Sequence, residues 1–60
     1  MNSEYKIIAD MIYENTRVLD VGCDDGSFME FLKTNKNVDI RGIEISKDKV
    51  QTCISKGLTV

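Results

Sequence analysis

The sequence predicts an α/β fold built on a parallel sheet. Two observations support this prediction: apolar residues at helical spacing alternate with short β-branched runs, and turn-forming residues separate the segments. The expected order is helix, strand, helix, strand, helix, strand, at residues 3–14, 17–21, 26–34, 39–45, 46–56 and 58–60. A strand, a connecting helix and a second strand imply parallel pairing with a right-handed crossover. Because the last strand has only begun at residue 60, we expect the chain to be the N-terminal part of a single larger domain.

The first predicted helix covers residues 3–14, with Ser3 as its cap. Its apolar residues recur at i, i+1, i+4 and i+5 and so define one helix face: Ile7, Ile8, Met11 and Ile12. We expect this face to cover the sheet. The alternative is that it forms a surface for a partner, exposed because the domain is unfinished.

The third predicted helix, residues 46–56, has recognisable ends. Ser46 is a good N-cap, and Gly57 suits the left-handed position just past a helix. Leu58 would then fold back onto Cys53 or Ile54 as the hydrophobic contact of that cap. In the second predicted helix we expect a buried face of three residues with Met29 beside it: Phe28, Phe31 and Leu32.

Composition excludes several functional classes. Eight basic and ten acidic residues give a formal charge of −2, so the chain lacks the basic stripe that binds nucleic acid. No apolar run approaches the roughly 20 residues that cross a membrane. With no His and no CxxC pattern, a zinc site is not expected. The two cysteines, Cys23 and Cys53, are expected to pack in the core, and unpaired thiols fit a cytoplasmic location.

The most informative segment joins the first strand to the second helix. Asp20 lies near the end of the strand, and Gly22 and Gly26 bracket the turn that follows. A helix that begins there points free N–H groups at the turn. Eighteen residues after Gly26, Glu44 follows the second strand, where an acid commonly binds ribose hydroxyls. Since the carboxyl ends of parallel strands share one sheet edge, these residues together predict a site for a nucleoside-containing ligand.

The charge of the turn selects among such ligands. Asp20, Asp24 and Asp25 would repel a pyrophosphate, at a cost of about 1 kcal/mol per close pair in water and more where partly buried. The sequence also lacks the GxxxxGK[ST] pattern of a phosphate-binding loop and the GxGxxG pattern of an NAD site. A ligand with a cationic centre and no phosphate fits better. S-adenosylmethionine has a sulfonium, an ammonium and a ribose.

Residues 18–26 resemble motif I of the class I S-adenosylmethionine-dependent methyltransferases, and residues 42–45 resemble their next motif. The whole chain more narrowly resembles the N-terminal portion of the methionine biosynthesis protein MetW family, through residues 7–10, 17–20, 42–45, 50–54 and 56–58. The resemblance implies a Rossmann-like methyltransferase fold and a set of cofactor-binding residues: Asp20, Gly22, Cys23, Asp24, Gly26, Glu44 and Ile45. Within that set, Glu44 would bind the ribose hydroxyls and Ile45 would pack near the adenine.

The same resemblance leaves two functions open. The first is a putative methyltransferase that holds S-adenosylmethionine, although the 60-residue chain alone is not expected to be active. The second is a non-catalytic partner or regulator of homoserine O-acyltransferase in methionine biosynthesis. Self-association through the unfinished sheet is a further expectation. One residue departs from the family pattern: Asp24 occupies a position that is usually glycine, and we expect its side chain to weaken cofactor binding.

Overall fold

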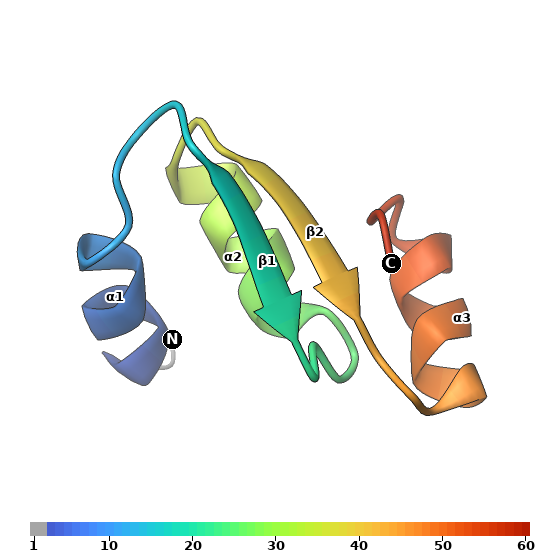
Figure 1. The fold of residues 1–60 in the computed structure, drawn as a ribbon. Helices are drawn as coiled ribbons and strands as arrows, with labels where there is room; N and C mark the ends of the chain where they lie inside the picture. The colour runs from blue at the N-terminus through green and yellow to red at the C-terminus, as the bar shows by residue number, and fades with distance from the viewer. Residues whose placement is uncertain (1–2) are drawn as a thin grey trace.

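The chain forms a small α/β fold with a two-stranded parallel sheet. The structure is a computed structural model and describes residues 3–60. The elements follow in the order α1 (Ser3–Asp10), β1 (Arg17–Val21), α2 (Ser27–Asn35), β2 (Asp39–Ile43) and α3 (Lys47–Ser55) (Figure 1). β1 and β2 pair in parallel, with Arg17 opposite Asp39 and Val21 opposite Ile43. The predicted fold class and the order of the first five elements are therefore confirmed.

The core lies between α2 and one face of the sheet. Met29 and Leu32 of α2 are fully buried, and Ile40 and Gly42 of β2 are buried beneath them. Alternate residues of a strand point to opposite faces, so the other face carries the exposed residues of both strands: Arg17, Leu19, Val21, Asp39, Arg41 and Ile43. The predicted face of the second helix is thus correct for Leu32, whereas Phe28 and Phe31 are only partly buried.

The first helix packs in a different way from the one predicted. Ile7, Ile8 and Met11 are 57, 46 and 73% exposed, so most of this face does not cover the sheet, whereas Ile12 is partly buried against the core. Instead α1 packs on α2: the ring of Tyr5 lies 5.3 Å from that of Phe28, centroid to centroid, and Ala9 is buried. The expected apolar face is wrong because the aromatic surface of α2 selects the competing face that carries Tyr5 and Ala9.

The first helix also ends at Asp10 rather than at residue 14. The segment after it bonds to the turn between α2 and β2, which removes its backbone from the helical pattern. The Asn15 N–H donates to the Asn37 carbonyl at 2.7 Å, and the Asn37 N–H donates to the Glu14 carboxylate at 2.8 Å. Asn15 has a φ of 60°, outside the helical region.

The ends of α3 follow the sequence prediction closely. The Ser46 hydroxyl accepts a hydrogen bond from the Lys49 N–H at 3.5 Å, as expected of an N-cap. At the other end, the Gly57 N–H donates to the Ile54 carbonyl and the Leu58 N–H donates to the Cys53 carbonyl, at 2.9 and 3.0 Å. These two bonds form a Schellman motif, and Leu58 is buried as its hydrophobic contact requires.

The strand predicted at residues 58–60 does not form as a strand. The segment does run beside β2 (Figure 1), and the Gly42 N–H donates to the Thr59 carbonyl at 2.9 Å. A single bond of this kind is too little to define a strand ladder. The second predicted strand likewise ends at Ile43, because the next backbone groups turn toward α3.

Replacing Gly42 with Ala should destabilise the fold. A Cβ atom on Gly42 would lie 2.7 Å from both the Cys23 Sγ and the Met29 Sδ, so buried side chains must move. Overpacking of this kind costs about 1–3 kcal/mol. Urea unfolding followed by circular dichroism should show this loss, and Arg41→Ala, an exposed neighbour on the same strand, should change stability far less. Equal effects of the two substitutions would contradict the packing described here.

Candidate functional site

The turn between β1 and α2, residues 22–26, is held in an unusual backbone conformation. Gly22, Asp24 and Gly26 have φ angles of 74, 57 and 84°, all in the left-handed region. Gly22 and Cys23 donate their N–H groups to the Ile43 carbonyl at 2.8 and 3.0 Å, which attaches the turn to the end of β2. The Gly26 N–H donates to the Cys23 carbonyl at 3.0 Å and closes the turn. Asp tolerates the left-handed region better than most residues.

Gly26 is required on the side of the turn that faces α3. A Cβ atom there would lie 2.4 Å from the Leu58 Cδ1 and 3.0 Å from the Cys53 Sγ. The residue combines a positive φ with close contact, and both conditions select glycine. Gly26 therefore supports the site by letting α3 pack closely on the turn.

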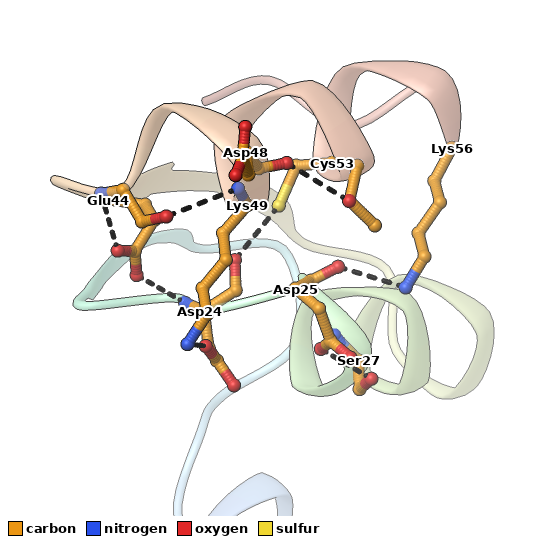
Figure 2. A network of polar contacts seen from close by, with 10 residues as sticks. Asp24, Asp25, Ser27, Glu44, Asp48, Lys49, Cys53 and Lys56 are labelled. Carbon is orange, nitrogen blue, oxygen red and sulfur yellow. Dashed lines mark hydrogen bonds and ion pairs between the residues drawn. The ribbon is translucent and has the colours of Figure 1, made fainter.

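Glu44 connects the turn to the start of α3 (Figure 2). Its Oε1 accepts from the Asp24 N–H at 2.7 Å, and its Oε2 accepts from the Ser46 N–H at 2.9 Å. The bond from Ser46, followed by that from Asp24, lowers the pKa of the Glu44 carboxyl below its ordinary value. A carboxylate offers about four acceptor positions, so this group keeps acceptor capacity for a ligand.

α3 and the residue that follows it contact the turn through three side chains at i, i+4 and i+7 (Figure 2). Lys49 forms an ion pair with the Asp24 carboxylate, and Cys53 donates its S–H to the Asp24 carbonyl at 3.3 Å. Lys56 donates to the Asp25 carbonyl at 2.9 Å. The two lysines were not among the site residues predicted from the sequence. Their spacing with Cys53 on one helix face, opposite an acidic turn, is the signal that would have indicated them.

The Asp25 carboxylate accepts hydrogen bonds from Ser27, the first residue of α2. Its Oδ1 accepts from the Ser27 hydroxyl at 2.6 Å and from the Ser27 N–H at 3.0 Å. These two bonds, the hydroxyl bond first, lower the pKa of the Asp25 carboxyl. The N–H of Ser27 is one that a phosphate would otherwise bind at a helix N-terminus. The two acids therefore oppose a phosphate to different degrees. The Asp24 carboxylate is paired with Lys49, whereas the Asp25 carboxylate occupies an N–H group that a phosphate would need.

A hollow of about 300 Å³ lies beside the turn, between it and the faces of α1 and α2. Asp20 is a half-buried acid in its wall, and burial raises the pKa of the Asp20 carboxyl. No group within residues 3–60 donates a hydrogen bond to that carboxylate. The hollow is lined by Tyr5, Ile8, Asp20, Gly22, Cys23, Asp24, Asp25 and Phe28.

Four of the seven sequence-predicted site residues line the hollow together: Asp20, Gly22, Cys23 and Asp24. The other three lie outside it. Glu44 is joined to it through the Asp24 N–H, Gly26 is buried where the turn meets α3, and Ile45 is 99% exposed. Four lining residues were not in the predicted set. Asp25 was noted only for its charge, and Tyr5, Ile8 and Phe28 were missed because they depend on how α1 packs on α2.

Fold and site together define a class: an α/β protein with an acidic turn at the carboxyl end of a parallel sheet. The chain belongs to the family described as methionine biosynthesis protein MetW, whose model matches residues 2–60. No curated protein and no solved structure matches the chain. Within residues 3–60, no helix has the length and apolar character needed to span a membrane. The same residues hold no group of three or more His, Cys, Asp or Glu side chains placed to bind a metal ion.

Replacing Glu44 with Gln should remove a pH-dependent part of the stability. The folded state lowers the pKa of Glu44 below its ordinary value, so the carboxylate stabilises the fold fully at any pH above that ordinary value. This contribution is lost as the pH falls through the lower, folded-state pKa. The stability difference between wild type and Glu44→Gln should therefore be constant near neutrality and vanish at low pH.

Denaturant unfolding at several pH values measures this difference. Asp10→Asn is the control, because that carboxylate lies on α1, 4.0 Å from Lys6 and away from the turn. A Glu44→Gln effect that persists unchanged at low pH would show that the carboxylate does not support the turn through its charge.

Proposed function

We propose that the hollow beside the turn binds the methionine end of S-adenosylmethionine. The observation that supports this most directly is the half-buried Asp20 carboxylate, which faces the hollow and receives no hydrogen bond from the described residues. Burying a carboxylate without a partner costs free energy, and a cation or N–H donor in the hollow would recover that cost. S-adenosylmethionine carries both an ammonium and a sulfonium.

The ribose of the same ligand would bind at Glu44. This carboxylate follows β2 at the carboxyl edge of the sheet, where open α/β sheets bind their ligands. It already accepts two backbone hydrogen bonds, which hold it in place, and it keeps acceptor positions for vicinal hydroxyls. Ile45, the next residue and almost fully exposed, would give the adenine an apolar surface.

The turn supports a ligand without phosphates. Asp25 holds the Ser27 N–H at the start of α2, so a pyrophosphate would have to displace a carboxylate that is already bonded there. An NAD-type dinucleotide is therefore disfavoured relative to S-adenosylmethionine.

A protein that binds this ligand could have either of two functions, methyl transfer or regulation of an acyltransferase. S-adenosylmethionine supplies an activated methyl group, and the residues of the turn would hold this donor in position, which is a large part of catalysing its transfer. Membership of a methionine biosynthesis family favours a second candidate, in which the protein binds homoserine O-acyltransferase and regulates it. Methyl transfer to small acceptors and acyltransferase activity with and without this protein distinguish the two: methylation supports the first role, and altered acyltransferase activity supports the second.

Calorimetric titration tests the binding proposal. We expect S-adenosylmethionine to bind and NAD not to bind. Asp20→Asn and Glu44→Gln should each weaken binding about tenfold or more, because each removes a charged partner worth about 1.5–3 kcal/mol. Asp39→Asn, at the opposite end of β2, is the matched control and should leave the affinity unchanged. An affinity that is the same in all three variants would refute the assignment.

Asp24→Gly should bind S-adenosylmethionine severalfold more tightly than the wild type. Asp24 has a φ of 57°, which glycine adopts without strain, and its side chain borders the hollow. Asp24→Asn separates size from charge, because it retains the bulk and removes the ion pair with Lys49. If bulk limits binding, only the glycine variant gains affinity. An unchanged affinity of Asp24→Gly would contradict the prediction.

A further inference from the structure

One face of the two-stranded sheet is uncovered. In Figure 1, α2 lies behind β1 and β2, and no helix of residues 3–60 crosses the nearer side of the two strands. Three apolar side chains on this side are 59, 73 and 54% exposed: Leu19, Val21 and Ile43. Parallel sheets occur almost only with both faces covered. The exposed face therefore indicates that a further layer packs on it.

The register of the strands determines the pattern of this open face. From the start of the strands to their carboxyl ends, it places six residues in three facing pairs: Arg17 with Asp39, Leu19 with Arg41, and Val21 with Ile43. The first pair has opposite charges, and the last pair is apolar. Asp39 also forms an ion pair with Arg41, 3.6 Å from Oδ1 to Nε. The face is therefore charged at its start and apolar at its end.

We propose that the open face binds the same face of a second copy of this chain, in a two-fold symmetric dimer with two packed sheets. In such a dimer each contact occurs twice, because residue i of one copy contacts residue j of the other and the reverse. Two sheets that pack face to face keep their strands roughly aligned, about 10 Å apart. These two conditions leave two orientations of the two-fold axis, along the strands or across them.

An axis along the strands makes the face complementary to itself. β1 of one copy then lies over β2 of the other, and both sheets run in the same direction. Arg17 faces the second copy's Asp39, and Val21 faces the second copy's Ile43, each twice by symmetry. Charge thus meets opposite charge at one end of the interface, and apolar side chains meet at the other.

The middle pair also fits this orientation. Arg41 of one copy lies over Leu19 of the other, where its methylene stem covers the leucine and its charged end stays near water. A hollow of about 180 Å³ on this face is lined in part by Leu19 and Arg41, and it leaves room for that stem.

An axis across the strands gives a poor interface. The sheets then run in opposite directions, and each strand lies over its own copy. Arg41 would face the second copy's Arg41, and Arg17 would face the second copy's Val21. Like charges repel, and a charge desolvated without a partner costs free energy. The pattern of the face therefore selects the axis along the strands.

The size of the face predicts a weak dimer. Each strand has only five residues, so the buried area lies at the low end of protein interfaces, below about 1,200 Å² in total, where transient complexes are found. Asp20 and the hollow beside the turn lie on the side of the sheet that faces α2, so the dimer leaves the proposed ligand site open. Dimer formation and ligand binding can therefore be tested separately.

Sedimentation equilibrium of the purified chain over a range of concentrations tests for the dimer. We expect a reversible equilibrium between monomer and dimer. Val21→Lys should weaken it about tenfold or more, because each dimer would place two unpaired ammonium groups among apolar side chains. A wild-type chain that stays monomeric at every concentration, or a dimer that Val21→Lys leaves unchanged, would overturn the proposal.

Two charge variants test the orientation. Arg17→Asp makes both positions of the charged pair acidic, and Asp39→Arg makes both basic, so each variant alone should dimerise about tenfold more weakly than the wild type. Mixed in equal amounts, the two variants should form a heterodimer, because acid then faces base at both positions. Lys6→Asp and Asp10→Lys alter an exposed ion pair on α1 and are the controls, which should dimerise like the wild type.

The mixing experiment also separates this dimer from one that pairs the free edges of two β1 strands. Edge pairing brings Arg17 to the second copy's β1 and not to its Asp39, so it predicts no selective heterodimer. A mixture that stays monomeric, or single variants that dimerise as the wild type does, would overturn the face-to-face arrangement. If a charge variant fails to fold by circular dichroism, the wild-type equilibrium and Val21→Lys still decide whether this face dimerises.

Discussion

The carboxylate of Glu44 is the contact on which the geometry of the site depends. It accepts hydrogen bonds from the N–H groups of Asp24 and Ser46, which belong to two different connections between strands and helices. The turn it holds contains three left-handed residues, one of them an aspartate. Glycine adopts this conformation readily, whereas an aspartate keeps it only where surrounding contacts specify it. The acid that would bind a ribose thus also organises the turn beside the hollow, so its loss would affect both halves of the site.

Helix α3 supplies the second support of the turn. Lys49, Cys53 and Lys56 contact Asp24 and Asp25 from one helix face (Figure 2). The exposed ion pair contributes little free energy by itself. The packing beneath it contributes more: a glycine in the turn lets the sulfur of Cys53 and the methyl of Leu58 approach the backbone, and the Schellman motif after α3 positions that leucine. Support of the turn therefore comes from packing and hydrogen bonds rather than from charge alone.

Much of this arrangement follows from the sequence because its signals are local. The N-cap at Ser46 and the helix end at Gly57 depend only on neighbouring residues, as do the β-branched strands. The packing of α1 could not be predicted in this way. Its sequence offers two helix faces, one with Ile7 and Ile8 and one with Tyr5 and Ala9, and the choice depends on the rings of α2. Three residues lining the hollow were missed for the same reason.

At the site, the sequence predicts which positions carry acids but not which groups those acids bind. The sequence places Glu44 at a strand end, yet only the folded chain shows that it binds the Asp24 N–H. The acids of the turn follow from the sequence, whereas Lys49, which pairs with the Asp24 carboxylate, lies on a later helix. Lys56 donates to the Asp25 carbonyl and forms its ion pair with Glu30. Contacts between segments that are distant in sequence decide these features, and single-sequence patterns do not report them.

One carboxylate, that of Glu44, holds both connections between strands and helices. An NMR titration of the Asp24 and Ser46 amide protons measures this directly. Both resonances should shift with a single common midpoint, which lies below the ordinary pKa of a glutamate and disappears in Glu44→Gln. Amide resonances that do not respond to pH in this range, or that follow separate midpoints, would contradict it.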